Sequence, residues 1–86
     1  MNAQIRKRSG ELAPFDETKI RSAVFKANIR FTQERLSPHQ LDELTHQVVR
    51  RALAGNFIPT VEQVQDLVEE CLIDHGYAQT AKAYIL

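Results

Sequence analysis

The 86-residue sequence predicts a mainly α-helical α+β fold, in which an N-terminal β-hairpin lies as a lid on a bundle of four helices. Two short segments separated by Ser9-Gly10 predict the hairpin, because glycine adopts the positive φ of a tight turn. Behind the hairpin, apolar residues recur at helical spacing after several helix-start signals. A chain of this length can bury one small core, so we expect residues 1–86 to form a single domain.

The hairpin is expected to run over residues 4–8 and to return over residues 11–15. A two-residue loop at Ser9-Gly10 would place Arg8 opposite Glu11. A two-stranded ribbon is only marginally stable alone, so the hairpin must pack against the helices.

The first helix is expected over residues 17–30 and the second from Pro38 to the Gly55-Asn56 pair. Asp16 is a suitable N-cap for the first, because its side chain accepts a backbone N–H of the following turn. The capping box of the second helix consists of Ser37 and a glutamine three residues later. Their apolar faces contain Ile20, Ala23, Val24 and Ala27 in the first helix and Leu41, Leu44, Val48 and Ala52 in the second.

The third helix is expected to follow Thr60, which begins a second capping box, and to end near His75-Gly76. Its apolar face contains Val61, Val64, Leu67, Val68, Cys71 and Leu72. The last helix, over residues 77–86, has no stop signal, so we expect the natural chain to continue beyond it.

The charges are unevenly distributed although the net charge is zero. Residues 1–30 carry seven Lys/Arg against three Asp/Glu, whereas residues 31–86 carry four against eight. A basic first third suits a small, localised anion better than duplex nucleic acid, which needs a broad basic face. No apolar run is long enough to span a membrane, and a single cysteine fits the reducing cytoplasm, where we expect the protein.

Catalytic chemistry has little support in the sequence. Cys71 lies on the apolar face of a helix and is interpreted as a core residue. His75 follows it by four residues, but no second Cys/His pair completes a zinc site. The carboxylates of the third helix follow one solvated face without an isolated acid–base pair. We therefore expect no catalytic residue, and no metal site made by protein side chains alone.

The strongest functional signal joins the hairpin to the start of the first helix. Alternate strand residues face one side, so Ile5 and Lys7 can offer one ligand an apolar contact and a cation. Lys19 lies in the first helical turn, where the N–H groups and the helix dipole also favour anions. The residues alone leave open that the hairpin is only an exposed ribbon whose charges prevent edge-to-edge pairing.

The order and spacing of several short segments resemble the ATP-cone domain along essentially the whole chain. These segments are Lys7-Arg8-Ser9-Gly10, Pro14-Phe15-Asp16, Lys19-Ile20, Pro59-Thr60-Val61 with Val64-Gln65, and Ala81-Lys82-Ala83-Tyr84. The ATP-cone is a non-catalytic regulatory domain at the N-terminus of many ribonucleotide reductases, and it also occurs in a transcriptional repressor of their genes. The resemblance implies that ATP or dATP, with Mg²⁺, binds beneath the lid as an allosteric effector. It also implies that the parent reductase's catalytic domain is the partner, often through effector-dependent oligomers.

Residue by residue, the resemblance implies a site on three parts of the chain. The nucleotide-contacting positions are Ile5, Lys7 and Arg8 on the hairpin, Asp16, Lys19 and Ile20 at the first helix, and Val61 and Gln65 on the third. The chain departs from the family at Ser9, where an aspartate is usual, and at Ala13, where many members carry a glutamate.

Three alternatives remain open from the sequence. The chain could be the nucleotide-sensing domain of the repressor, a DNA-binding helical module or a protein-interaction domain. The repressor carries a zinc ribbon before this domain, and this chain starts at Met1 without one, which favours a reductase as parent.

Overall fold

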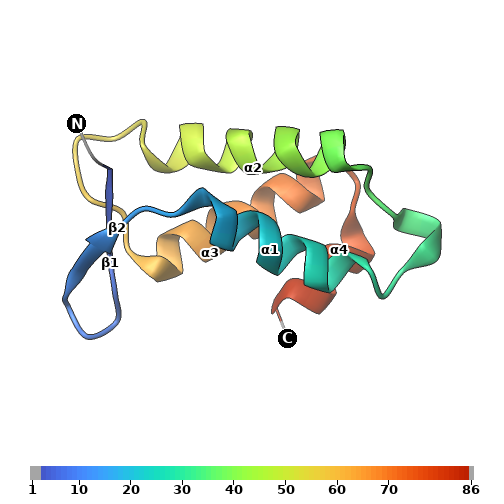
Figure 1. Ribbon diagram of the computed structural model, residues 1–86, viewed down its shortest axis with the longest axis horizontal. Coiled ribbons are helices and arrows are strands. Elements are labelled where there is room, and N and C mark those ends of the chain that lie inside the picture. The colour runs from blue at the N-terminus through green and yellow to red at the C-terminus, as the bar shows by residue number, and fades with distance from the viewer. Residues whose placement is uncertain (1–2, 86) are drawn as a thin grey trace.

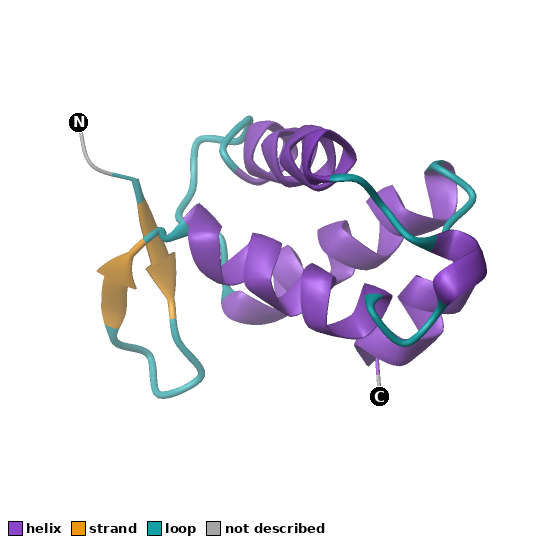
Figure 2. Cartoon of the chain, turned by 45° about the vertical axis from the view of Figure 1, so that its right-hand side comes forward, coloured by secondary structure: helices purple, strands orange, loops and turns teal. Residues whose placement is uncertain are grey.

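The computed structural model describes residues 3–85 as a β-hairpin followed by four α-helices, as Figures 1 and 2 show. The elements are β1 (Gln4–Arg6), β2 (Leu12–Pro14), α1 (Glu17–Asn28), the 3₁₀ turn η1 (Thr32–Glu34), α2 (Pro38–Ala52), α3 (Val61–Asp74) and α4 (Ala78–Ile85). This confirms the predicted mainly helical fold with an N-terminal hairpin. The predicted end of the last helix, Leu86, lies outside the described residues.

The register of the hairpin differs by one residue from the prediction. The strands pair Ile5 with Ala13, and the Lys7 N–H donates to the Glu11 carbonyl. The loop therefore contains three residues, Arg8–Gly10, and the predicted two-residue loop is wrong. The reason is Gly10, which follows the turn at a φ of 90° and makes the extra residue possible. As a result, Ala13 rather than Leu12 shares a face with Ile5.

The hairpin is joined to the bundle by a contact that the sequence did not predict. The Arg6 N–H donates to the Pro59 carbonyl at 2.9 Å, and Arg6 forms a parallel bridge with Thr60. The free edge of β1 thus pairs with the segment that leads into α3. The hairpin lies at one end of the bundle, beside the starts of α1 and α3 (Figure 1).

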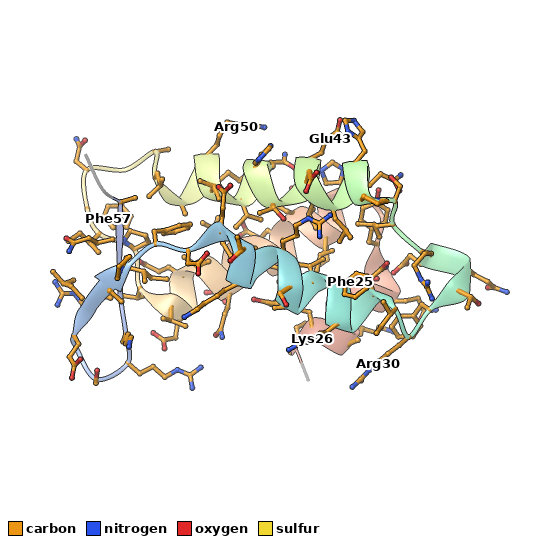
Figure 3. The ribbon with its side chains drawn as sticks, in the orientation of Figure 1. Phe25, Lys26, Arg30, Glu43, Arg50 and Phe57 are labelled. Atoms are coloured by element: carbon orange, nitrogen blue, oxygen red, sulfur yellow. The ribbon has the colours of Figure 1, made fainter. Side chains whose placement is uncertain are left out.

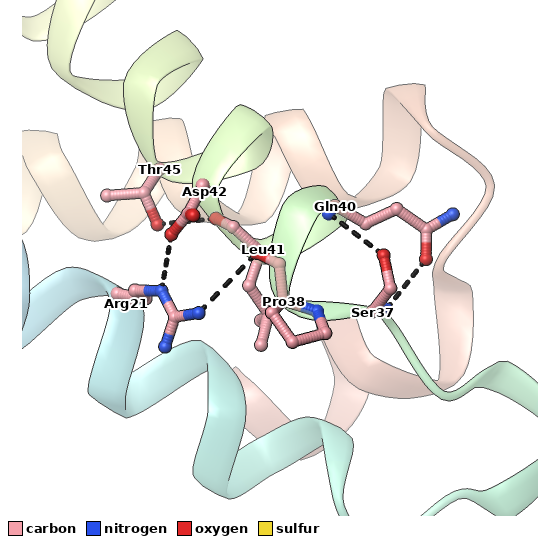
Figure 4. Close-up of polar contacts among 7 residues, drawn as sticks. All are labelled: Arg21, Ser37, Pro38, Gln40, Leu41, Asp42 and Thr45. Atoms are coloured by element: carbon pink, nitrogen blue, oxygen red, sulfur yellow. Dashed lines mark hydrogen bonds and ion pairs between the residues drawn. The ribbon is translucent and has the colours of Figure 1, made fainter.

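The helix starts follow the predicted caps. Asp16 accepts the Thr18 N–H, and complete capping boxes at Ser37 and Thr60 begin α2 and α3 (the Ser37 box is drawn in Figure 4). Figure 4 also shows Arg21 of α1, whose Nε lies 2.6 Å from an Asp42 oxygen of α2 and ties these helices together.

Three predicted boundaries need correction. Helix α1 ends at Asn28 instead of residue 30, and η1 interrupts the predicted loop over residues 31–36. Helix α2 ends at Ala52, before Gly55-Asn56, with Leu53 as its C-cap. Gly55 has another role, because a Cβ there would collide with the ring of Phe57.

The core lies between the four helices, which contact one another in the cyclic order α1–α2–α3–α4. The predicted apolar stripe of α2 is fully buried, whereas Val61 and Leu67 of the α3 stripe are only partly buried. The buried apolar residues are Val24, Ala27, Leu36, Leu41, Leu44, Val48, Ala52, Val64, Val68, Cys71, Leu72 and Ala81.

A buried polar network closes the end of the bundle opposite the hairpin. The Asn28 amide donates to the Glu34 carbonyl and the Thr80 hydroxyl, and its oxygen accepts the Leu36 N–H. The Glu34 carboxylate accepts the N–H groups of Gln79 and Thr80 and thereby caps α4. Burial raises the pKa of Glu34, but the hydrogen bonds from Thr80 and Gln79 outweigh it, so the pKa lies below its ordinary value.

Candidate functional site

A hollow of about 280 Å³ lies between the hairpin, the start of α1, the first turns of α3 and the end of α4. Seven of the eight predicted site residues line it, namely Ile5, Lys7, Asp16, Lys19, Ile20, Val61 and Gln65. The other lining residues are Ala13, Pro14, Phe15, Ala23, Val64 and Tyr84. The fold thus brings together residues that are up to 79 positions apart in the chain, from Ile5 to Tyr84.

Local structure explains why these side chains converge. Strand alternation turns Ile5 and Lys7 to the same face. The Asp16 cap begins α1 so that Lys19 and Ile20 fall in its first turn. Val61 and Gln65 are four residues apart on α3 and therefore share one helix face.

The hollow has an apolar wall. Ile5, Phe15, Ile20 and Tyr84 are partly buried and pack against the core, so they combine a fixed position with a surface open to a ligand. Such a wall suits a flat apolar group, because burying it removes apolar surface from water on both sides.

The charged groups of the hollow favour an anion. Lys7 and Lys19 both line it, and neither forms an ion pair with any residue of the described range 3–85. Asp16 is the one carboxylate among the lining residues, and one of its oxygens already accepts the Thr18 hydroxyl at 2.6 Å and the Thr18 N–H at 3.0 Å. These two hydrogen bonds lower the pKa of Asp16, and the charge of Lys19 lowers it further.

Arg8 does not lie in this hollow, although it was predicted with Lys7. It lines a neighbouring hollow of about 560 Å³ together with Lys26 of α1 and Arg30, which follows that helix. Figure 3 shows Lys26 and Arg30 on the side of α1 that points away from α2. Ala23, Gln65 and Tyr84 line both hollows, so the two are continuous at these residues.

The side chain of Arg8 is held by α3. Its Nε lies 2.7 Å from a Glu62 carboxylate oxygen, and its Nη2 lies 3.5 Å from the Gln65 amide oxygen. Arg8 therefore stands at the border between the two hollows, bound to a carboxylate of the protein itself.

Tyr84 is a lining residue that the sequence analysis did not single out. It lies one turn after the buried Ala81 on α4 and contacts both hollows. Burial raises the pKa of its phenol, so the ring stays neutral. The motif Ala81-Lys82-Ala83-Tyr84 contained the signal, since an aromatic three residues after a buried alanine faces the same side.

A larger hollow, of about 680 Å³, lies near η1 and the start of α4, but its charged groups are less available to a ligand. Two of its charged side chains already have partners, because Glu34 caps α4 and Arg35 donates to the Ile29 carbonyl. Size alone therefore does not identify the functional site.

Cys71 and His75, which were considered for catalysis or zinc binding, line none of these three hollows. Cys71 is fully buried, and burial raises the pKa of its thiol. His75 stacks on Tyr77, and its Nε2 lies 2.6 Å from the Gln47 amide oxygen. Within residues 3–85 no group of three metal-ligating side chains occurs, and no helix is long and apolar enough to cross a membrane.

Several known proteins are similar in sequence to this chain. The chain is 32% identical, over its full length, to a vitamin B12-dependent ribonucleoside-diphosphate reductase of Thermoplasma acidophilum. It is 33% and 37% identical, over 93% of its length, to ribonucleoside-diphosphate reductase alpha subunits of Chlamydia trachomatis and Chlamydia pneumoniae. The chain spans only 9–12% of the length of these relatives. Residues 3–86 match the ATP cone domain, and the chain belongs to this family.

Proposed function

We propose that this chain is a non-catalytic regulatory domain that binds ATP or dATP beneath the hairpin and controls the activity of a ribonucleotide reductase. The family supports an adenine nucleotide as effector, and the curated relatives are reductases. The observation that carries the proposal is the hollow in which Lys7 and Lys19, neither of which forms an ion pair within residues 3–85, face an apolar wall.

The size of the hollow suggests how the nucleotide lies. Its 280 Å³ is just below the ~300–1,000 Å³ of most ligand pockets, so it accommodates part of a nucleotide rather than all of it. We place the base and sugar against Ile5, Ile20 and Tyr84. The phosphates lie between Lys7 and Lys19 and extend toward the neighbouring hollow.

The remaining predicted residues take supporting roles. Asp16 holds the first turn of α1, and with it Lys19, in place. Val61 packs beside the nucleotide, and the Gln65 amide borders both hollows and can hydrogen-bond the sugar or the phosphates. Arg8 completes the phosphate site once it leaves Glu62.

Mg²⁺ would be bound mainly by the phosphates. Asp16 is the only carboxylate among the residues lining the 280 Å³ hollow, and it already caps α1. Magnesium commonly keeps several waters and uses substrate phosphates together with one or two carboxylates. The effector therefore arrives as a magnesium–nucleotide complex.

Regulation requires that the two nucleotides bias different states of a larger assembly. The partner is the catalytic domain of the reductase, and the states differ in how this domain contacts it or in their oligomeric form. We place this assembly in the cytoplasm.

A titration of the 86-residue chain with ATP and dATP tests the binding. Ligand at a hundred times its dissociation constant adds about 2.7 kcal/mol, which raises the melting temperature of a domain this small by roughly 11–22 °C. Lys7→Ala and Lys19→Ala should weaken the response, while Lys82→Ala, which removes a charge outside both hollows, should not. No shift at millimolar nucleotide, with and without Mg²⁺, would rule the proposal out.

A salt series separates this function from DNA binding. A duplex-binding module loses affinity steeply between roughly 50 and 200 mM salt. Saturable nucleotide binding without measurable duplex binding at the lower concentration supports the regulatory role.

A further inference from the structure

The position of Arg8 carries an inference that rests on the proposed nucleotide site. Arg8 is the hairpin-tip cation at the border of the two hollows, yet its guanidinium is paired with Glu62 at 2.7 Å. Lys7 and Lys19, in contrast, have no ion pair among residues 3–85. The same site therefore holds two cations that are ready for an anion and one that is already neutralised.

We propose that Glu62 is an internal competitor of the nucleotide phosphates, which holds Arg8 away in the empty site and lowers the affinity for polyphosphates. Phosphate oxygens and a carboxylate bind a guanidinium through the same forked N–H groups, so Arg8 cannot serve both fully at once. A phosphate that binds Arg8 must displace the Glu62 carboxylate and also lies close to its negative charge.

The geometry makes this exchange easy. The side chains of Arg8 and Glu62 are 72% and 51% exposed, so water can replace either partner when the pair separates. The weak 3.5 Å contact between Arg8 and Gln65 gives the guanidinium a position next to a residue that lines both hollows. Rotation of one long side chain about the hairpin tip is sufficient, and the backbone need not move.

The exposure also limits the size of the effect. Exposed ion pairs contribute up to about 1 kcal/mol, which is about a fivefold change in an equilibrium constant. Glu62→Gln removes the charge and keeps the shape, and we expect it to tighten ATP binding by about two- to fivefold. The gain should fall from ATP to ADP to AMP and vanish for adenosine, because only the phosphates compete.

Asp66 provides a matched control. It lines the same neighbouring hollow as Arg8 but forms no ion pair within the described chain. Asp66→Asn removes the same charge without releasing Arg8, so it should improve ATP affinity less than Glu62→Gln does. In an Arg8→Ala background, Glu62→Gln should give no gain.

Calorimetric titration of the 86-residue chain and these variants decides between the possibilities. Unchanged or weaker ATP binding by Glu62→Gln, an equal gain in Asp66→Asn, or a gain that persists without Arg8 would each overturn the inference alone. Absence of ATP binding by the unaltered chain would overturn the proposed function, and the inference with it. Glu62 also lies in the first turn of α3, so circular dichroism checks folding, and Glu62→Ala repeats the test if Glu62→Gln is unfolded.

Discussion

Asn28 offers a sharp test of how this small bundle is held together. Its side chain is fully buried at the end of α1 and forms three hydrogen bonds, two of them with the Glu34 carbonyl at 3.0 Å and the Thr80 hydroxyl at 2.8 Å. The third accepts the Leu36 N–H at 2.9 Å. One amide thus joins α1, the 3₁₀ turn and α4.

Replacing Asn28 with alanine removes all three hydrogen bonds, although the Thr80 hydroxyl keeps the one that it donates to the Glu34 carboxylate. The Leu36 N–H loses its acceptor and the Thr80 oxygen loses a donor, both in buried surroundings. A buried polar group left unsatisfied costs roughly 1–3 kcal/mol, so we expect a loss of about 3 kcal/mol. For a chain of this size that lowers Tm by roughly 12–24 °C.

Thermal melts followed by circular dichroism measure this loss. Asn56→Ala is the matched control, because Asn56 is exposed and its side chain forms no hydrogen bond within residues 3–85. Because α4 also carries Tyr84, the Asn28 variant should respond less to ATP. A loss of stability below about 1 kcal/mol, similar to that of the control, would show that the Asn28 hydrogen bonds do not hold α1, η1 and α4 together.

Three further predictions concern single residues. The folded-state pKa of Glu34 is depressed, so its stabilisation is present above its ordinary value of 4.5 and is lost as the pH falls through the folded value. Glu34→Gln should therefore have a lower Tm than the unaltered chain at pH 7, with a difference that disappears in acid; melts from pH 7 to pH 3 test this, and a constant difference contradicts it. Gly10→Ala should lower the free energy of unfolding by about 1 kcal/mol, because the φ of 90° strains alanine even though no atom lies within 4 Å of the new methyl group. An unchanged midpoint in denaturant unfolding would show that alanine tolerates this turn. Tyr84→Ala should weaken ATP binding roughly tenfold, by analogy with base–aromatic stacking, whereas Tyr84→Phe should stay within about twofold in calorimetry; equal losses would assign the effect to the hydroxyl.

Much of the local structure could be read from the sequence. The caps at Asp16, Ser37 and Thr60 lie where they were predicted, because a side-chain oxygen and a backbone N–H a few residues apart meet without help from the rest of the fold. The end of α2, before Gly55-Asn56, was harder to predict, because it depends on how the following loop packs around Phe57.

Distant contacts could not be predicted in this way. The pairing of Arg6 with Pro59 and the convergence of Tyr84 with Ile5 each require the whole bundle to form first. The Asn28–Thr80 hydrogen bond likewise joins residues 52 positions apart, and no local sequence pattern predicts it.

The hairpin shows which features follow from the sequence and which depend on the tertiary structure. The sequence by itself determined that a short basic ribbon precedes the helices and that Lys7 shares a face with Ile5, because strand alternation is a local property. Only the tertiary structure decided that Gly10 adds a third loop residue and that Arg8 at the tip meets Glu62. The position of that guanidinium depends on where α3 packs against the hairpin, so its partner is set by the fold as a whole.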